Sequence, residues 1–258
     1  MLATLFDFPQ EEKHKLTFWS DTATSSPASG AAMTTQEKRQ AALMECLETF
    51  TALWKEREDK PEGARLDFIS ALANSEATRD ISPGEYLSTL ILLIVGGNDT
   101  TRNSISGGVL ALNENPAEYQ KLRDEPKLIP NMVSEMIRWQ TPLAHMRRRA
   151  TQDTELGGKQ IKKGDKVVMW YVSANRDDSV IERADEFLID RKNPKQHLSF
   201  GWGVHFCMGS RLAEMQLRIL WEEIMNRFRL VEVVGDPIRV RSNFVKGFSE
   251  LPVRVHPL

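Results

Sequence analysis

One glycine-rich stretch, residues 197–209, most constrains how this chain can fold. It reads His-Leu-Ser-Phe-Gly-Trp-Gly-Val-His-Phe-Cys-Met-Gly and leads directly into residues 210–228, an amphipathic pattern without proline or glycine. We therefore predict a loop followed by a helix, with Cys207 close to the first exposed N–H groups of that helix. Those N–H groups and the helix dipole favour the thiolate over the thiol. A thiolate is a soft ligand that suits iron, copper or zinc.

Two interpretations of Cys207 compete at the level of the sequence. A lone cysteine in a glycine-rich loop is most often a buried structural residue. A zinc site would need three further Cys or His ligands at short spacing, which the sequence does not supply. Gly201, Gly203 and Gly209 would instead let the backbone approach a flat, bulky group without Cβ collisions. The residue types and their spacing leave both interpretations open at this point.

Composition and charge limit the class of protein. The chain has 258 residues, and 41% of them are apolar, which is enough for a substantial core. Its formal net charge of −2 argues against nucleic acid as the main partner. Cys46 and Cys207 provide no disulfide framework, which fits a reducing cytoplasm. The first residues show no export signal, and the longest apolar run, Leu90–Val95, is too short to span a bilayer. We therefore expect a soluble, cytoplasmic protein without a membrane span.

Hydrophobic periodicity predicts a mainly α fold with small β-sheets. A loop rich in Ser, Thr, Ala and Gly is predicted at 22–35, and a polar, irregular segment at 175–194. Short strands are predicted at 166–172 and in alternating pieces after residue 231. Helices are predicted at residues 10–24, 36–60, 66–74, 83–113, 116–123, 126–138 and 210–228.

The helix predicted at 83–113 carries a second unusual stretch. Ser82 and Glu85 form a capping box at its start, with proline at the first helical position. Near its middle, residues 95–101 read Val-Gly-Gly-Asn-Asp-Thr-Thr. Paired glycines inside a helix cost about 1 kcal/mol each relative to alanine. Close helix packing would explain them, and so would a local opening that admits dioxygen and water beside an acid and an alcohol. The sequence leaves both explanations open.

Both stretches resemble motifs of one family, the cytochrome P-450 monooxygenases. Residues 200–209 match its heme-ligand signature in full: Phe, two residues, Gly, three residues, Cys, one residue, Gly. They include the bacterial refinement of a glycine directly after the phenylalanine and a histidine two residues before the cysteine. Residues 95–101 resemble the central-helix motif of the same family: small residue, Gly, any residue, acid, Thr, Thr. The resemblance implies a cytochrome P-450 domain over residues 1–258.

The resemblance also implies roles for these residues. Cys207 corresponds to the thiolate that ligates the iron of heme b. Thr100 corresponds to the threonine that hydrogen-bonds dioxygen, and Asp99 to the acid that feeds it protons. Gly96 and Gly97 would face the iron. The remaining residues that the resemblance places at the heme are Phe200, Gly201, Gly209 and His205, the last as a propionate contact.

Two further motifs fit the family. Glu135 and Arg138 lie at i, i+3 on one helix face, where an exposed pair contributes only about 0.2–0.5 kcal/mol. In the family this pair belongs to a buried structural network that locks the heme-ligand loop, completed here by Arg191 or a neighbour. Three successive arginines at 147–149 are most often a solvated face. Against the family pattern Arg-x-Ala, Arg148 takes the place of an arginine that binds a heme propionate, and Arg147 is the fallback.

Residues 96–104, 136–148 and 212–218 look like the bacterial alkane-hydroxylating branch. This resemblance implies hydroxylation of the terminal carbon of medium-chain alkanes or related fatty acids. It also implies O2 as co-substrate and electrons from a ferredoxin and its reductase. Two alternatives stay open: the same fold acting on a terpene, fatty acid or sterol side chain, and a truncated heme-binding chain without catalysis. The sequence resembles the C-terminal portion of a family member, beginning just ahead of the lid helices at 10–24 and 36–59 and lacking the N-terminal part.

Apolar walls for the substrate pocket are expected from three regions of the chain. Residues 244–248 are predicted as a hairpin tip that reaches into the pocket. Leu and Phe at such spacings are more often plain core. The residues selected as walls are Leu92, Leu93, Leu143, Ala144 and Phe248.

Overall fold

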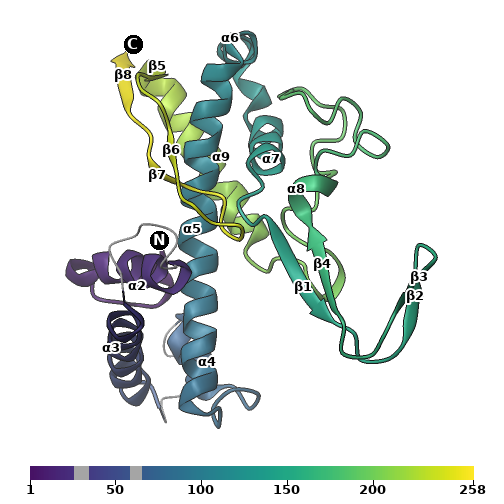
Figure 1. The fold of residues 1–258 in the computed structure, drawn as a ribbon. Coiled ribbons are helices and arrows are strands. Elements are labelled where there is room, and N and C mark those ends of the chain that lie inside the picture. Colours follow the sequence, from purple (N-terminus) through teal and green to yellow (C-terminus); the bar gives the residue numbers. More distant parts are fainter. Residues whose placement is uncertain (26–34, 59–65) are drawn as a thin grey trace. The chain divides into compact units, whose positions relative to one another are not determined.

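The computed structural model describes residues 1–25, 35–58 and 66–258 (Figure 1). Residues 26–34, which make up most of the loop predicted at 22–35, lie outside the described residues, as do the last two residues of the helix predicted at 36–60. The chain divides into two compact units, Met1–Thr100 and Thr101–Leu258. One long helix, α5 (Pro83–Glu114), contributes residues to both.

The first unit is helical and is built around an aromatic core. The rings of Trp19 and Phe50 lie 5.9 Å apart, and both side chains are fully buried. Phe6 packs edge-on against Phe50 at 5.2 Å, and Leu90 of α5 is buried in the same cluster. The elements that precede α5 are α1 (Leu2–Leu5), η1 (Gln10–Glu12), α2 (His14–Thr24), α3 (Gln36–Lys55) and α4 (Phe68–Asn74).

Helix α2 ends where the helix predicted at 10–24 ends, and not where the overlapping loop predicted at 22–35 begins. It ends at Thr24, so residues 22–24, which were expected to begin the loop, are helical. Two observations fit this helical end: Thr22 is buried, and the hydroxyl oxygen of Thr24 lies 3.0 Å from the carbonyl oxygen of Ser20, four residues earlier. The start of the loop at residue 22 was therefore wrong by one helical turn.

Side-chain caps fix the starts of the next two helices. Asp67 accepts hydrogen bonds from the N–H groups of Ile69 and Ser70, both at 2.9 Å, so α4 begins at Phe68 and not at residue 66. At α5 the carboxylate of Glu85 accepts from the backbone N–H of Ser82 at 2.9 Å and from its hydroxyl at 2.7 Å. This is the predicted capping box, and it is confirmed.

Helices of the second unit enclose its own core. Trp221 of α9 (Ser210–Arg227) and Met132 and Met136 of α7 (Ile129–Gln140) are completely buried in one cluster. Leu112 of α5 and Leu122 of α6 (Pro116–Asp124) belong to the same cluster. The helix predicted at 126–138 begins with a 3-10 turn and reaches Gln140. The elements after α5 are α6 (Pro116–Asp124), η3 (Pro126–Leu128), α7 (Ile129–Gln140), α8 (Tyr171–Ala174), η4 (Gly203–His205) and α9 (Ser210–Arg227).

A glycine pair in the second half of α5 lets α7 approach closely. A Cβ on Gly108 would lie 1.4 Å from the terminal methyl of Met136, and one on Gly107 would lie 2.3 Å from the side-chain oxygen of Gln140. A Cβ at either position would force the side chain of Met136 or Gln140 to move. These two glycines, which no motif in the sequence singles out, allow the present packing of α7 against α5.

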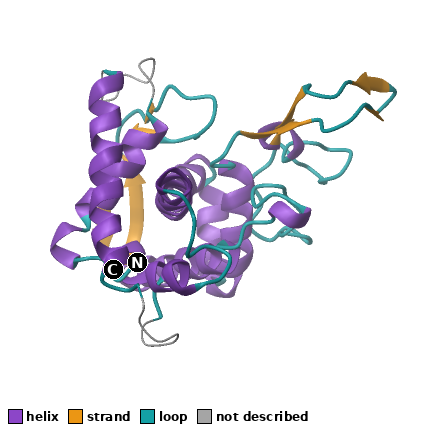
Figure 2. Cartoon of the chain, turned by 90° about the horizontal axis from the view of Figure 1, so that it is seen from below, coloured by secondary structure: helices purple, strands orange, loops and turns teal. Residues whose placement is uncertain are grey.

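Within the described residues the strands form two-stranded antiparallel sheets, and Figure 2 shows the strands in orange. The β1–β4 pair projects from the helices of its unit, and β2–β3 forms its far end in both Figure 1 and Figure 2. The strand predicted at 166–172 ends at Trp170 because Tyr171 is buried at the start of α8. The pairs are β1 (His145–Arg149) with β4 (Lys166–Trp170), β2 (Thr154–Leu156) with β3 (Lys159–Ile161), β5 (Phe228–Val233) with β8 (Val253–Pro257), and β6 (Ile238–Arg239) with β7 (Phe248–Glu250).

The predicted fold class, mainly α with small sheets, is confirmed. Within residues 1–25, 35–58 and 66–258, no helix combines the length and the apolar character that crossing a membrane requires.

Candidate functional site

The loop before α9 presents Cys207 at the surface of the second unit. The side chain is exposed, and α9 begins three residues later with Gly209 at its N-cap. The N–H of Cys207 donates to the carbonyl oxygen of Phe200 at 2.8 Å, and its own carbonyl accepts from the N–H of Ser210 at 3.2 Å. The loop is therefore closed on itself by backbone bonds while the thiol stays accessible. A buried structural cysteine does not describe this residue.

Glycine is required at one position of this loop for two reasons. Gly201 has a φ of +74°, a region that side chains with a Cβ rarely adopt. A Cβ at this position would also lie 3.1 Å from the carbonyl oxygen of His205, inside normal van der Waals contact. The glycine thus allows the turn that brings Phe200 and Cys207 together.

The second cysteine lies in a different environment. Cys46 is buried in the core of the first unit, and burial raises the pKa of its thiol to about 12, with Glu45 adding to the rise. A thiol of that kind stays protonated and does not ligate metals at neutral pH. In the part of the chain that the structure describes, no group of three or more His, Cys, Asp or Glu side chains could hold a metal ion. A multi-ligand zinc site is therefore not formed there.

The surroundings of Cys207 fit a flat, largely apolar group such as heme. Large apolar side chains of the same loop point outward: Val204 is 97% exposed and Met208 is 84% exposed. Trp202 and Phe206 are exposed as well. Such clustering of exposed apolar side chains is typical of a surface that covers a ligand or a partner. The thiol of Cys207 supplies the one soft donor atom that a heme iron needs from the protein.

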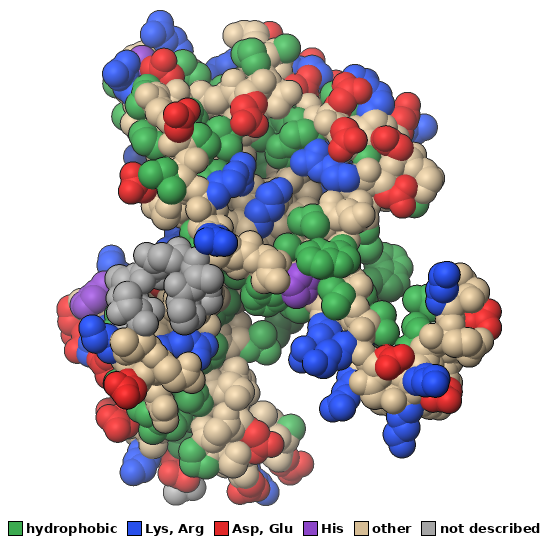
Figure 3. All heavy atoms as spheres, viewed as in Figure 1, with side chains coloured by type: hydrophobic (Ala, Val, Ile, Leu, Met, Phe, Trp, Pro, Cys, Tyr) green, Lys and Arg blue, Asp and Glu red, His purple; other side chains and the backbone are tan. Residues whose placement is uncertain are grey.

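The residues expected at the heme propionates lie in the same unit. His205 closes η4 and is exposed. Along β1 alternate side chains point to opposite faces. Arg148 is half-buried, whereas Arg147 and Arg149 are exposed on the other face. The guanidinium of Arg148 donates to the carbonyl oxygen of Arg147 at 3.2 Å. Lys and Arg side chains gather along the β1–β4 pair in Figure 3.

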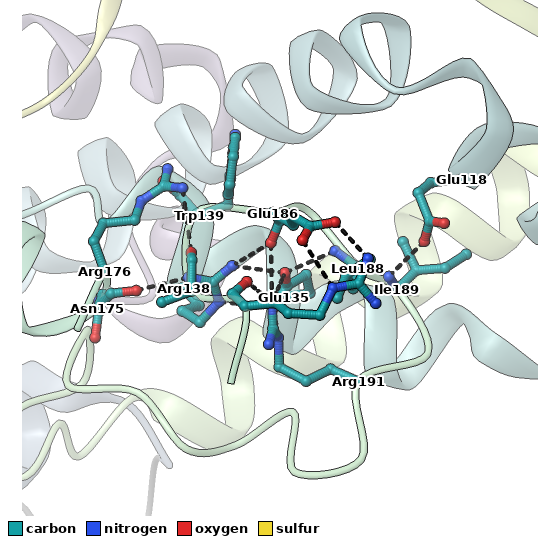
Figure 4. Close-up of polar contacts among 12 residues, drawn as sticks. Glu118, Glu135, Arg138, Trp139, Asn175, Arg176, Glu186, Leu188, Ile189 and Arg191 are labelled. Carbon is teal, nitrogen blue, oxygen red and sulfur yellow. Dashed lines mark hydrogen bonds and ion pairs between the residues drawn. The ribbon is translucent and has the colours of Figure 1, made fainter. Parts of the chain in front are cut away.

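Glu135 is the centre of a buried ion network (Figure 4). Arg138 donates to both of its carboxylate oxygens at 2.7 and 2.8 Å, and Arg191 donates to the same two oxygens at 3.2 and 3.0 Å. The N–H of Leu188 adds a bond of 2.9 Å. Burial alone would raise the pKa of Glu135, but the hydrogen bonds from the two arginines outweigh it and hold the pKa below its usual range. The carboxylate therefore stays ionised although it is fully buried.

Asn175 joins this network to the cysteine loop. Its carbonyl oxygen accepts from Arg138 at 2.6 Å, and its side-chain oxygen accepts from the N–H of Leu198 at 2.7 Å. Its side-chain nitrogen donates to the hydroxyl of Ser199 at 2.9 Å, and that hydroxyl donates to the carbonyl oxygen of Ile137 at 2.9 Å. The start of the loop is thereby fixed to α7. Nothing in the sequence singles out Asn175, because an Asn-Arg-Asp tripeptide in a polar segment carries no distinguishing pattern.

Residues 95–101 lie on an uninterrupted stretch of α5, and all of them except Thr101 belong to the first unit. The hydroxyl of Thr100 donates to the carbonyl oxygen of Gly96 at 2.6 Å. A Cβ on Gly96 would meet nothing within 4 Å, whereas one on Gly97 would lie 2.6 Å from a methyl of Leu2. The two glycines therefore differ: Gly97 permits packing against α1, and Gly96 faces open space.

Asp99 is buried, and hydrogen bonds hold both oxygens of its carboxylate. Its exposed fraction is 1%. Thr24, at the end of α2, donates to Oδ2 at 3.1 Å, and Asn98 donates to Oδ1 at 3.1 Å. An acid and an alcohol, Asp99 and Thr100, thus lie next to each other on one helix, the first fixed and the second partly exposed.

The expected pocket walls fall into two groups. Leu93 is half-buried and Leu92 is 70% exposed on α5. In the second unit, Leu143 forms an isolated β-bridge with Val245, and the N–H of Ala144 donates to the carbonyl oxygen of Phe244 at 2.8 Å. Backbone hydrogen bonds therefore connect the segment between β6 and β7 to residues 143–144. The expected wall residues Leu143 and Ala144 thus lie beside this segment. The predicted wall residue Phe248 lies in β7, and its N–H donates to the side-chain oxygen of Asn103 at 3.3 Å.

Comparison with known proteins identifies the family. Residues 29–253 match the family model of cytochrome P-450. Curated relatives include linalool 8-monooxygenase from Pseudomonas putida, 45% identical over 192 residues, 74% of this chain and 47% of that protein. They also include methyl-branched lipid omega-hydroxylase from Mycobacterium bovis, 41% identical over 200 residues, 76% of this chain and 46% of that protein. The chain thus spans about half the length of the curated relatives it matches.

A solved structure extends this similarity along nearly the whole chain. Cytochrome P-450-153 from Novosphingobium aromaticivorans is 50% identical and superposes with a TM-score of 0.89, covering 99% of this chain and 62% of its own. The mainly helical architecture, the loop that presents Cys207 and the Glu135 network therefore occur in a chain whose sequence and fold both match known members. The chain belongs to the cytochrome P-450 family.

Proposed function

We propose that this protein is a heme-thiolate monooxygenase that hydroxylates an unactivated C–H bond of a small apolar molecule. The observation that carries the proposal is the exposed thiol of Cys207, presented by a closed glycine loop at the start of α9 in a chain of this family. Cys207 would ligate the iron of heme b. When bound, the heme supplies the activation of O2 and the insertion of one oxygen atom into the substrate.

Residues of the second unit would hold this cofactor. Arg148 and His205 offer donors to the propionates, and a guanidinium suits a carboxylate because its N–H groups form a planar fork. Arg147 stays the fallback, since it is the more exposed of the two neighbours. Glu135, Arg138 and Asn175 would keep the ligand loop in place, because their bonds connect α7 to its first residues.

Residues of α5 would deliver protons to the reaction. The buried carboxyl of Asp99 would hold a proton and pass it on, and the Thr100 hydroxyl, which donates to the carbonyl oxygen of Gly96, lies on the next residue of the same helix as the alcohol that would relay it. Gly96, which faces open space, leaves room for dioxygen and water beside them. Apolar walls from Leu92, Leu93, Leu143, Ala144 and Phe248 would exclude bulk water from the reacting carbon.

The terminal carbon of medium-chain alkanes or related fatty acids is the proposed target. The three sequence stretches that resemble the alkane-hydroxylating branch support it. The name of the relative methyl-branched lipid omega-hydroxylase also refers to attack at a chain end. Electrons would come from a ferredoxin and its reductase, in the cytoplasm. A terpene is the second candidate, because linalool 8-monooxygenase is 45% identical over 192 residues.

A reduced, CO-bound difference spectrum tests the heme assignment. We expect the band typical of a thiolate-ligated heme in the wild-type protein, and its loss in Cys207→Ala. Cys46→Ala is the matched control, because it removes the other cysteine of the chain from a buried site, and it should retain the band. A wild-type protein without this band, after reconstitution with heme, would contradict the proposal and favour the non-catalytic alternative.

Product analysis tests the substrate. The reconstituted protein, ferredoxin and reductase are supplied with a linear alkane, a fatty acid, linalool or a sterol in separate reactions. A terminal alcohol from the alkane as the fastest-formed product supports the first candidate. Faster turnover of linalool supports the terpene candidate, and attack on an internal alkane carbon contradicts terminal specificity.

A further inference from the structure

The last residue of α2 touches the buried acid of α5. The Thr24 hydroxyl oxygen lies 3.1 Å from Oδ2 of Asp99, although 75 positions of sequence separate the two residues. Both belong to the first unit. The family motifs explain Asp99 and Thr100, but they assign nothing to Thr24.

The Thr24 hydroxyl has one hydrogen and more than one acceptor. The carbonyl oxygen of Ser20 lies 3.0 Å away and that of Asp21 lies 3.5 Å away, so Asp99 competes with both for the same hydrogen. A charged acceptor forms the stronger bond. While Asp99 is ionised, the hydrogen therefore points to its carboxylate.

The same contact survives when Asp99 takes up a proton. A protonated carboxyl becomes a donor, and the hydroxyl oxygen of Thr24 has lone pairs that accept from it. The hydrogen of Thr24 then turns to the carbonyl oxygen of Ser20, which already lies within hydrogen-bond distance. The two residues exchange donor and acceptor roles, and no heavy atom has to move. Asn98 differs, because its amide N–H bonds Oδ1 as a donor and fits the ionised form.

We propose that Thr24 is a positioning residue for Asp99: its hydroxyl holds the carboxyl in one place in both protonation states, so that the acid returns to the same geometry after each proton transfer. This inference rests on the proposed function, in which Asp99 passes protons beside Thr100. The hydrogen bond from Thr24, in the last turn of α2, to Asp99 also connects this helix directly to the proposed proton donor.

Three variants separate positioning from a general effect on folding. Thr24→Val keeps the shape of the side chain and removes both the donor and the acceptor. Thr24→Ser keeps the hydroxyl. Thr22→Val is the matched control, since Thr22 lies in the same helix, is buried, and has a hydroxyl without a hydrogen-bond partner in the described part of the chain.

The first measurement does not depend on activity. Infrared difference spectra across a pH titration give the carboxyl band of Asp99, identified by its absence in Asp99→Asn. We expect the band to move to higher frequency in Thr24→Val, because a hydrogen bond is lost, and to stay in place in Thr24→Ser and Thr22→Val. An unchanged band in Thr24→Val overturns the inference.

The second measurement uses the heme-loaded protein with its electron donors. In Thr24→Val we expect the product formed per electron consumed to fall about five- to tenfold, the effect of one hydrogen bond on a rate, with a changed pH profile. Thr24→Ser should restore the wild-type value, and the CO-bound spectrum should be the same in all variants. If wild type itself lacks that spectrum, the proposed function fails, while the infrared result still decides whether Thr24 holds Asp99. A shifted band with wild-type coupling would overturn the role in proton delivery.

Discussion

Arg138 donates from Nη1 to the carbonyl oxygen of Asn175 at 2.6 Å, and through this bond a buried ion network reaches the cysteine loop. Both members of the Glu135–Arg138 ion pair are fully buried, and Arg191 is nearly so. Burying charges is costly unless every one of them is paired. The network therefore stabilises the loop only while the carboxylate and both guanidinium groups are present.

Glu135→Gln should destabilise the protein by about 3–5 kcal/mol, because it leaves two buried arginines without their counter-charge. Unfolding in urea, followed by circular dichroism, measures the change. Glu186→Gln is the control: its carboxylate pairs with Arg183 at the surface, where both side chains are more than half exposed. A surface pair contributes at most about 1 kcal/mol. Equal losses in the two variants would contradict a special role of the buried network.

His197 should make stability depend on pH. Burial lowers the pKa of His197 to about 4, and the positive charge of Arg138 acts in the same direction. Its Nδ1 accepts a hydrogen bond from the N–H of Ser199 at 3.3 Å, which requires an unprotonated nitrogen. The unfolded chain binds this proton near pH 6.5, so stability is present above that pH and is lost as the pH falls toward 4.

His197→Gln should remove this dependence. The amide does not titrate, so the slope of unfolding free energy against pH between about 6.5 and 4 should flatten by on the order of 2 kcal/mol over the interval. Urea unfolding at a series of pH values measures it. His14→Gln, at an exposed position of the first unit, is the control that should retain the wild-type slope. An unaltered slope in His197→Gln would refute the assignment.

Local signals in the sequence predicted most elements of the fold. The Ser82–Glu85 capping box fixes the start of α5, and the Pro- and Gly-free pattern after residue 209 fixes α9. Both depend on neighbours three or four residues apart. Residues 22–24 fell both in the helix predicted at 10–24 and in the loop predicted at 22–35. The contact of Thr24 with Asp99, which belongs to the helical alternative, is invisible in a linear pattern.

The site was predictable only where a motif concentrates it. Cys207 and its glycines occupy ten consecutive positions, so their arrangement could be recognised. Asn175 joins three segments that are far apart in sequence, and nothing in its own surroundings distinguishes it. Gly107 and Gly108 look like the earlier glycine pair of α5, yet the structure shows that they serve packing against α7. A Gly-Gly pair alone does not reveal which of the two uses applies.

Gly96→Ala and Gly97→Ala distinguish two uses of glycine, close packing and open space for dioxygen, in the pair Gly96–Gly97. Alanine in a helix interior stabilises by about 1 kcal/mol relative to glycine. Gly96→Ala should show this gain in urea unfolding, because the added methyl meets nothing within 4 Å. Gly97→Ala should show less or none, because its Cβ would lie 2.6 Å from a methyl of Leu2. If Gly96 leaves room for dioxygen, Gly96→Ala should gain stability and lose hydroxylation, and unchanged turnover would argue against that use.

Thr100→Ala should separate oxygen consumption from product formation. The variant removes the hydroxyl that now donates to Gly96 and that we assign to proton delivery. Loss of a positioned acid–base group lowers a rate by about a hundredfold or more, so most of the electrons consumed should appear as hydrogen peroxide and not as alcohol. The CO-bound spectrum should not change, because Cys207 lies on another element. Thr100→Ser keeps a hydroxyl and should retain most of the coupling, while Thr101→Ala controls for the loss of a neighbouring threonine. Wild-type coupling in Thr100→Ala would refute the assignment of the proton path to this hydroxyl.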